Sequence, residues 1–152
     1  MKKYKFKLEA LLKMRKLRED ESKMRIGRLQ TKKLELEDSV RKQEGGIDQA
    51  YESQEATVAK GGATGLDLSF YPYFVQGKRA AIGKLQEEIA ALDDLLARSY
   101  EELKGLRAKT KVLEEMKEKD KKARKKEMNK KSYQKIEEQV MNWSLLQKRM
   151  EK

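Results

Sequence analysis

The chain has 152 residues and a net charge of +11, with 41% charged and 38% hydrophobic residues. It contains no cysteine and no histidine. This composition excludes disulfides, thiol nucleophiles, zinc sites of the usual kind and imidazole bases. The length suits a single domain spanning residues 1–152. No apolar run reaches the length of a membrane span and no signal peptide is visible, so we expect a cytoplasmic protein.

No catalytic motif occurs in the sequence. The glycine-rich stretch at residues 61–65 (GGATG) lacks the lysine-serine or lysine-threonine ending of a phosphate-binding loop. The abundant carboxylates are explained by solvated helix faces. We therefore expect no enzymatic activity, no cofactor, no metal site and no small-molecule substrate.

The first predicted element is one helix over about residues 3–60. Its apolar residues recur at helical spacing, although several positions between them are polar. Gly45 and Gly46 interrupt the pattern, and each glycine costs roughly 1 kcal/mol inside a helix, so we expect a weak point or a bend there. The apolar positions are Phe6, Leu8, Leu11, Leu12, Met14, Leu17, Ile26, Leu29, Leu36, Val40 and Ile47.

A turn is predicted over about residues 61–68, near Thr64. Three glycines within five residues suit a left-handed helix end and a chain reversal. Ser69 can then cap a second helix, which places Pro72 in the first turn, where its missing N–H does no harm.

The second helix is predicted over about residues 69–150, and its clearest signal is the spacing of apolar residues between 82 and 106. These recur at alternating intervals of three and four, as on the seam of a coiled coil, with Ser99 as the one break. Such a narrow seam suits one partner helix. A short glycine turn favours a partner within the chain, at about residues 17–47, over a dimer. The seam residues are Ile82, Leu85, Ile89, Leu92, Leu96, Leu103 and Leu106.

The last 25 or so residues extend beyond the reach of the first helix in this hairpin. They carry their own apolar stripe, which calls for a partner; fraying or local packing is an equally weighted alternative. The stripe consists of Ile136, Val140, Trp143, Leu146 and Met150.

Charge is unevenly distributed along the chain. Residues 2–18 carry a net +7 and residues 107–135 a net +8, whereas residues 35–101 carry a net −6. An antiparallel hairpin brings the two basic blocks to the same end. This charge calls for an anionic partner, and nucleic acid and an acidic protein surface are about equally favoured, with a merely solvated basic face as the simplest alternative.

Four aromatic residues lie just after the predicted turn. Phe70, Tyr71, Tyr73 and Phe74 either cap the core of the hairpin or form a docking patch for another protein. Phe74, Lys78 and Ala81 share one helix face by their spacing.

Three stretches resemble the FliJ family, a soluble coiled-coil component of the bacterial flagellar type III export apparatus. They are residues 4–15 (YKFKLEALLKMR), 71–76 (YPYFVQ) and 111–119 (KVLEEMKEK), in the order and at the spacing of the family. The resemblance implies an all-α fold: a long antiparallel two-helix coiled-coil hairpin, similar to the coiled coil of the rotary ATPase gamma subunit.

The resemblance also implies a function and its partners. The open end of the hairpin would enter the hexameric export ATPase, and the other side would contact the cytoplasmic linker of the export-gate membrane protein, at the inner membrane. Export chaperones would be further partners. With this family role, no nucleic-acid partner is expected. The equivalent stalk of a virulence type III secretion system, and a basic coiled coil that binds nucleic acid, remain alternatives.

Candidate site residues follow from the resemblance and from the charge map. The gate-binding candidates are Tyr73, Phe74, Lys78, Ala81 and Leu85; Lys78 and Leu85 stand where the best-known member has a leucine and a histidine. The ATPase-binding candidates are Lys13, Arg15, Lys16, Arg18, Lys121, Lys122, Arg124, Lys125 and Lys126.

Overall fold

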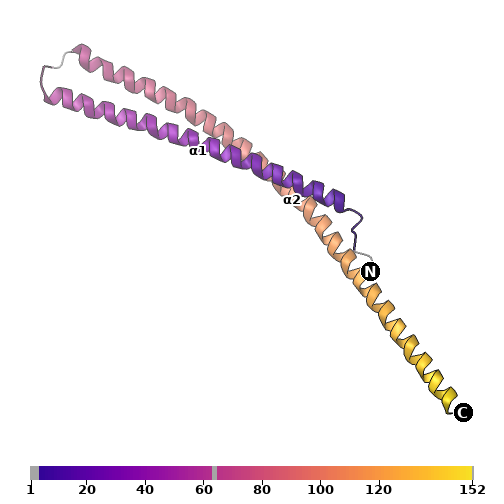
Figure 1. Ribbon diagram of the computed structural model, residues 1–152. Helices are drawn as coiled ribbons and strands as arrows, with labels where there is room; N and C mark the ends of the chain where they lie inside the picture. The colour runs from indigo at the N-terminus through magenta and orange to yellow at the C-terminus, as the bar shows by residue number, and fades with distance from the viewer. Residues whose placement is uncertain (1–3, 63–64, 152) are drawn as a thin grey trace. The chain divides into compact units, whose positions relative to one another are not determined.

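The structure is a computed structural model that describes residues 4–62 and 65–151, without the side chains of Leu66 and Asp67. It consists of two long helices, α1 (Glu9–Ala59) and α2 (Gly65–Met150), and the described residues contain no strand (Figure 1). The two helices pack against each other as an antiparallel hairpin, so the predicted all-α fold is confirmed. No helix of the described residues is long and apolar enough to cross a bilayer.

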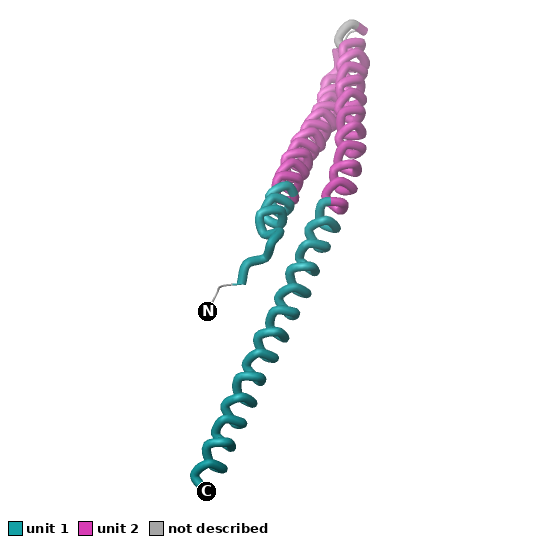
Figure 2. The backbone as a smooth tube through the Cα atoms, turned by 90° about the vertical axis from the view of Figure 1, so that its right-hand side faces the viewer, with its two compact units in different colours: residues 1–18, 106–152 teal, residues 19–105 magenta. Residues whose placement is uncertain are grey.

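The chain forms two compact units, which we describe separately (Figure 2). The loop unit comprises residues 19–105 and contains the turn between the helices. The terminal unit comprises residues 1–18 and 106–152.

Leucine and isoleucine side chains form the core of the loop unit. Ile26 of α1 packs with Leu96 and Leu103 of α2, all three are buried, and Leu29 lies against them. The predicted pairing within the chain is confirmed at Leu96 and Leu103, whose partner Ile26 lies in the predicted partner segment 17–47. Ser99, the break in the apolar spacing, is buried and donates its hydroxyl to the Leu95 carbonyl at 2.8 Å.

A lysine–aspartate pair joins the two helices in the middle of the loop unit. The Lys33 ammonium lies 2.6 Å from the Asp93 carboxylate. Mainly through this hydrogen bond, Asp93 raises the pKa of Lys33 above its ordinary value. The stabilisation from this pair is therefore complete below the ordinary lysine pKa and is lost only as the pH rises through the raised value.

The turn begins with glycines in the left-handed region. Gly61 and Gly62 have φ values of +72° and +79°, which favour glycine. The predicted turn centre at Thr64 lies outside the described residues. The expected cap at Ser69 is wrong, because α2 begins at Gly65. Pro72 therefore lies inside the helix rather than in its first turn. Because proline has no N–H, it cannot donate the helical hydrogen bond to the Leu68 carbonyl.

In the terminal unit, the first turn of α1 packs closely on α2. Leu12 is 1% exposed, and Leu113 and Thr110 of α2 are buried. The apolar face expected over residues 6–17 is narrower than predicted, because Met14 is 43% and Leu17 62% exposed. Two ion pairs flank the contact: Lys117–Glu9 at 2.8 Å and Lys16–Glu114 at 3.6 Å.

Residues 4–8, just ahead of α1, are not helical, although the sequence predicts a helix from about residue 3. Residues 4–6 are irregular, residues 7–8 form a turn, and the Glu9 N–H donates to the Phe6 carbonyl at 3.1 Å. Phe6 is 9% exposed. Burial of this ring and the contacts of Tyr4 with α2 replace the helical hydrogen bonds that these residues would otherwise make.

Candidate functional site

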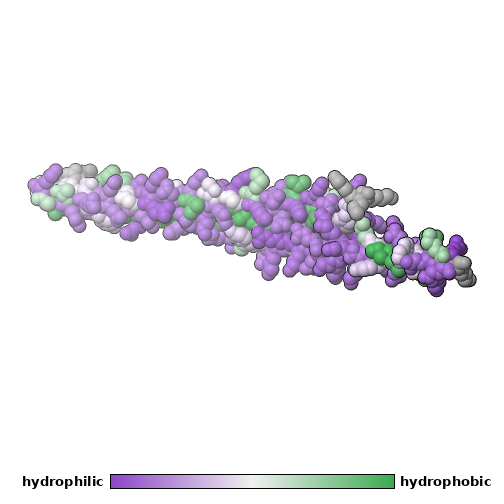
Figure 3. Space-filling model, turned by 60° about the horizontal axis from the view of Figure 1, so that its bottom comes forward, coloured by the Kyte–Doolittle hydropathy of each residue, from purple (hydrophilic) through white to green (hydrophobic). Residues whose placement is uncertain are grey.

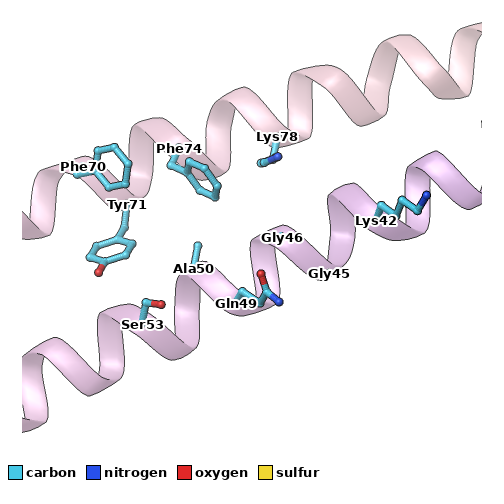
Figure 4. Close-up of a pocket in the computed structure, with 10 residues that line it drawn as sticks. All are labelled: Lys42, Gly45, Gly46, Gln49, Ala50, Ser53, Phe70, Tyr71, Phe74 and Lys78. Carbon is cyan, nitrogen blue, oxygen red and sulfur yellow. The ribbon is translucent and has the colours of Figure 1, made fainter.

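Three of the four aromatic residues after the turn, Phe70, Tyr71 and Phe74, line an open groove between α1 and α2 in the loop unit (Figure 4). The groove has a volume of about 600 Å³. The Phe70 and Phe74 rings stack with their centroids 5.8 Å apart, and Phe70 is 61% exposed. We call this the aromatic groove; it is lined by Lys42, Gly45, Gly46, Gln49, Ala50, Ser53, Phe70, Tyr71, Phe74 and Lys78.

The gate-binding candidates do not all share this groove. Phe74 and Lys78 line it, and the Lys78 ammonium lies 5.3 Å from the centre of the Phe74 ring, within range of a cation–π contact. Ala81 and Leu85 are half-buried further along α2. Tyr73 is 76% exposed and is not among the residues that line the groove.

The structure divides the residues after the turn between the core and the surface, and the docking patch stays a prediction. Val75 is buried, and the half-buried Tyr71 places its hydroxyl 3.4 Å from the Thr57 hydroxyl, so these two residues close the core of the loop unit. Phe70 and Tyr73 remain exposed and available to a partner.

Gly46 forms part of the floor of the groove. A Cβ at this position would lie 3.4 Å from the Lys78 side chain, which is ordinary packing distance. As expected, α1 continues through Gly45 and Gly46 without a break, and the weak point or bend expected there stays a prediction. The sequence did not predict that Gly46 lines the groove, because residue spacing alone does not show that the Lys78 side chain approaches it.

The basic candidates come from both ends of the sequence and lie in the terminal unit. This unit holds 24 basic and nine acidic residues, a net charge of +15, whereas the loop unit has a net charge of −4. Arg15 is half-buried; the other candidates are exposed: Lys13, Lys16, Arg18, Lys121, Lys122, Arg124, Lys125 and Lys126.

Tyr4 joins the N-terminal segment to this basic surface. Its hydroxyl donates to the Asp120 carboxylate at 2.8 Å, and its ring lies 5.1 Å from the Arg124 guanidinium. Desolvation and the hydrogen bond to Asp120 raise the pKa of the Tyr4 hydroxyl, which keeps it protonated as a donor. Sequence reasoning missed this role; the only signal was an aromatic residue just ahead of the first helix.

Glu9 is the acidic residue at the start of α1, where a negative charge favours the helix dipole. The Lys117 ammonium lies 2.8 Å from its carboxylate, and this close pairing lowers the pKa of Glu9. Because the pKa is lowered in the folded chain, this stabilisation is present at neutral pH and is lost as the pH falls through the lowered value.

The C-terminal part of α2, from residue 121, contains no buried side chain. Every residue from 121 to 151 is exposed, including the predicted apolar stripe: Ile136 (55%), Val140 (58%), Trp143 (62%), Leu146 (56%) and Met150 (87%). We call these five residues the C-terminal apolar face. Figure 3 shows a surface that is mostly hydrophilic and is broken by small hydrophobic patches.

Comparison with known proteins gives one match. The family model described as flagellar FliJ protein matches residues 4–147, nearly the whole chain. No curated protein and no solved structure matches the chain.

Proposed function

The chain belongs to the FliJ family and is therefore a protein of flagellar export, and we propose that it acts as a non-enzymatic stalk between two larger components of the export apparatus. The terminal unit binds within the hexameric export ATPase. The loop unit contacts the cytoplasmic linker of the export-gate membrane protein, and export chaperones are further partners. The protein works in the cytoplasm, where it is peripherally associated with the export apparatus of the inner membrane.

One observation carries this proposal: the two basic blocks, about a hundred residues apart in sequence, belong to the same compact unit. Their mutual repulsion raises the energy of the free protein, and an acidic ring lumen would relieve it. A stalk without catalytic groups acts by binding the conformations of the ring with different affinities, because a ligand shifts an equilibrium only through that difference.

The direct test is stimulation of the cognate export ATPase. Replacing Lys121, Lys122, Lys125 and Lys126 by glutamate should reduce stimulation at least about tenfold, because each reversed charge weakens contact with an acidic lumen. ATP hydrolysis by the purified ATPase, with and without the full-length chain, gives the measurement.

A matched control changes the same total charge in the loop unit. Arg28, Lys32, Lys60 and Lys84 are exposed there, and their replacement by glutamate should leave stimulation nearly unchanged. Equal loss in the two variants would contradict the assignment, because it would show dependence on net charge rather than on the basic surface of the terminal unit.

The gate contact is tested at the aromatic groove. Phe74→Ala should weaken binding to the cytoplasmic part of the gate protein by about 2 kcal/mol, or roughly thirtyfold, as expected for an aromatic anchor. Titration calorimetry with the purified gate domain measures the change. Tyr51→Ala serves as the control, since this half-exposed ring lines a different groove of the loop unit. Unchanged affinity in Phe74→Ala would remove the groove from the gate contact.

A further inference from the structure

The C-terminal apolar face forms a coherent stripe rather than a scatter of exposed residues. Successive residues of an α-helix are about 100° apart, so these five side chains lie within an arc of about 120°. The largest of them, Trp143, is 62% exposed. The stripe spans about four turns of helix, and no part of the described chain covers it.

A strongly basic segment leads directly into this face. Residues 119–135 contain nine basic and two acidic residues, a net of +7. From residue 121 onward all of them are exposed, and they point to all sides of the helix. Any surface that covers the apolar face must therefore also accommodate this positive charge.

A second copy of the chain fits these constraints poorly. Only about two heptads of apolar residues are available, and isolated helices need longer seams to pair stably. Parallel pairing would also bring one basic segment close to another. An anionic lipid surface satisfies both requirements, because acidic headgroups attract lysine-rich helices, while tryptophan and aliphatic side chains enter the boundary between headgroups and acyl chains.

We propose that residues 119–150 of α2 form a membrane-surface helix, in which the basic segment binds acidic phospholipid headgroups and the C-terminal apolar face inserts shallowly into the bilayer. The helix lies on the membrane and does not span it. This site goes beyond the proposed stalk function. Because it uses some of the same lysines as ATPase binding, lipid and ATPase compete for the terminal unit.

The chain carries its own reporter for this site, since Trp143 is its single tryptophan. Full-length protein is titrated with vesicles made of equal parts phosphatidylglycerol and phosphatidylcholine, and in parallel with pure phosphatidylcholine vesicles. We expect a blue shift of Trp143 emission and co-sedimentation with the acidic vesicles only. No export protein is present, so the outcome does not depend on the stalk proposal.

Two variants separate the contributions of charge and apolar contact. Replacing Lys121, Lys122, Lys125 and Lys126 by glutamine should weaken vesicle binding by at least about a hundredfold, since each basic residue near an acidic surface contributes roughly fivefold. Ile136→Ser with Leu146→Ser should reduce both the blue shift and the affinity about tenfold or more, because two inserted side chains are lost.

The matched control removes two other exposed apolar residues of the same helix. Met141 and Leu145 lie outside the stripe and are 67% and 58% exposed, so Met141→Ser with Leu145→Ser should bind as the unaltered protein does. Helix content from circular dichroism verifies that all variants fold.

Several results would overturn the proposal. These are the absence of vesicle binding, equal binding to uncharged vesicles, binding without a blue shift, or equal losses in the two serine pairs. A blue shift that grows with protein concentration in the absence of lipid would instead assign the face to contact between copies.

Discussion

Replacing Leu96 by aspartate is expected to unfold the loop unit. Leu96 is 7% exposed and packs with Ile26 and Leu103 in the buried cluster of this unit. A carboxylate at this position would have to give up its hydration without gaining a partner, which costs more than about 4 kcal/mol. We expect a large loss of the circular dichroism signal at 222 nm and of the thermal transition.

The neighbouring residue provides the control for this substitution. Leu95 is 46% exposed, so Leu95→Asp introduces the same charge into the same helix turn but on the solvent side. Its melting temperature should stay within a few degrees of that of the unaltered chain. If Leu96→Asp melted like Leu95→Asp, the seam would not lie where the structure places it.

Truncation of Leu12 is expected to detach the start of α1 from the terminal unit. This side chain is 1% exposed, and burial of this completeness gives a cost of about 3 kcal/mol for a leucine-to-alanine change. Hydrogen exchange of the amides at residues 12–18 should accelerate by more than about a hundredfold, since local opening becomes easier by that free energy.

Leu17→Ala is the matched comparison, since Leu17 lies on the same stretch of α1 and is 62% exposed. Its amide exchange should change by less than about threefold. Similar acceleration in the two variants would show that the first turns of α1 do not pack on α2 through Leu12.

Regular spacing made the middle of the fold predictable. The seven seam residues between 82 and 106 define a register by themselves, and an intrachain partner followed from the short glycine turn. The opposite side of the seam is harder to read, because Ser22, Lys33 and Gln43 occupy inward positions of α1. Lys33 has its partner, Asp93, on α2, and this pairing becomes visible only once the helices are paired.

The first residues of the two helices could not be predicted, because they depend on contacts that a sequence pattern does not show. Tyr4 and Phe6 leave the helical conformation because they gain contacts with the rest of the terminal unit. Similarly, α2 starts at Gly65 and continues through Pro72, although local preference favours a start at Ser69. The candidate surfaces were predicted from charge, from aromatic content and from the family resemblance, whereas the Gly46 floor and the Tyr4 contact depend on how the chain packs.

The Lys33–Asp93 pair also has a mechanical consequence. A slip of one heptad between the helices of the loop unit would keep leucines facing apolar positions, but it would set Lys33 opposite Gln86 or Tyr100 instead of a carboxylate. A polar pair beside the seam therefore makes sliding less favourable where apolar contacts alone would tolerate it. Under an axial load on one helix, the pair opposes a change of register relative to the other helix.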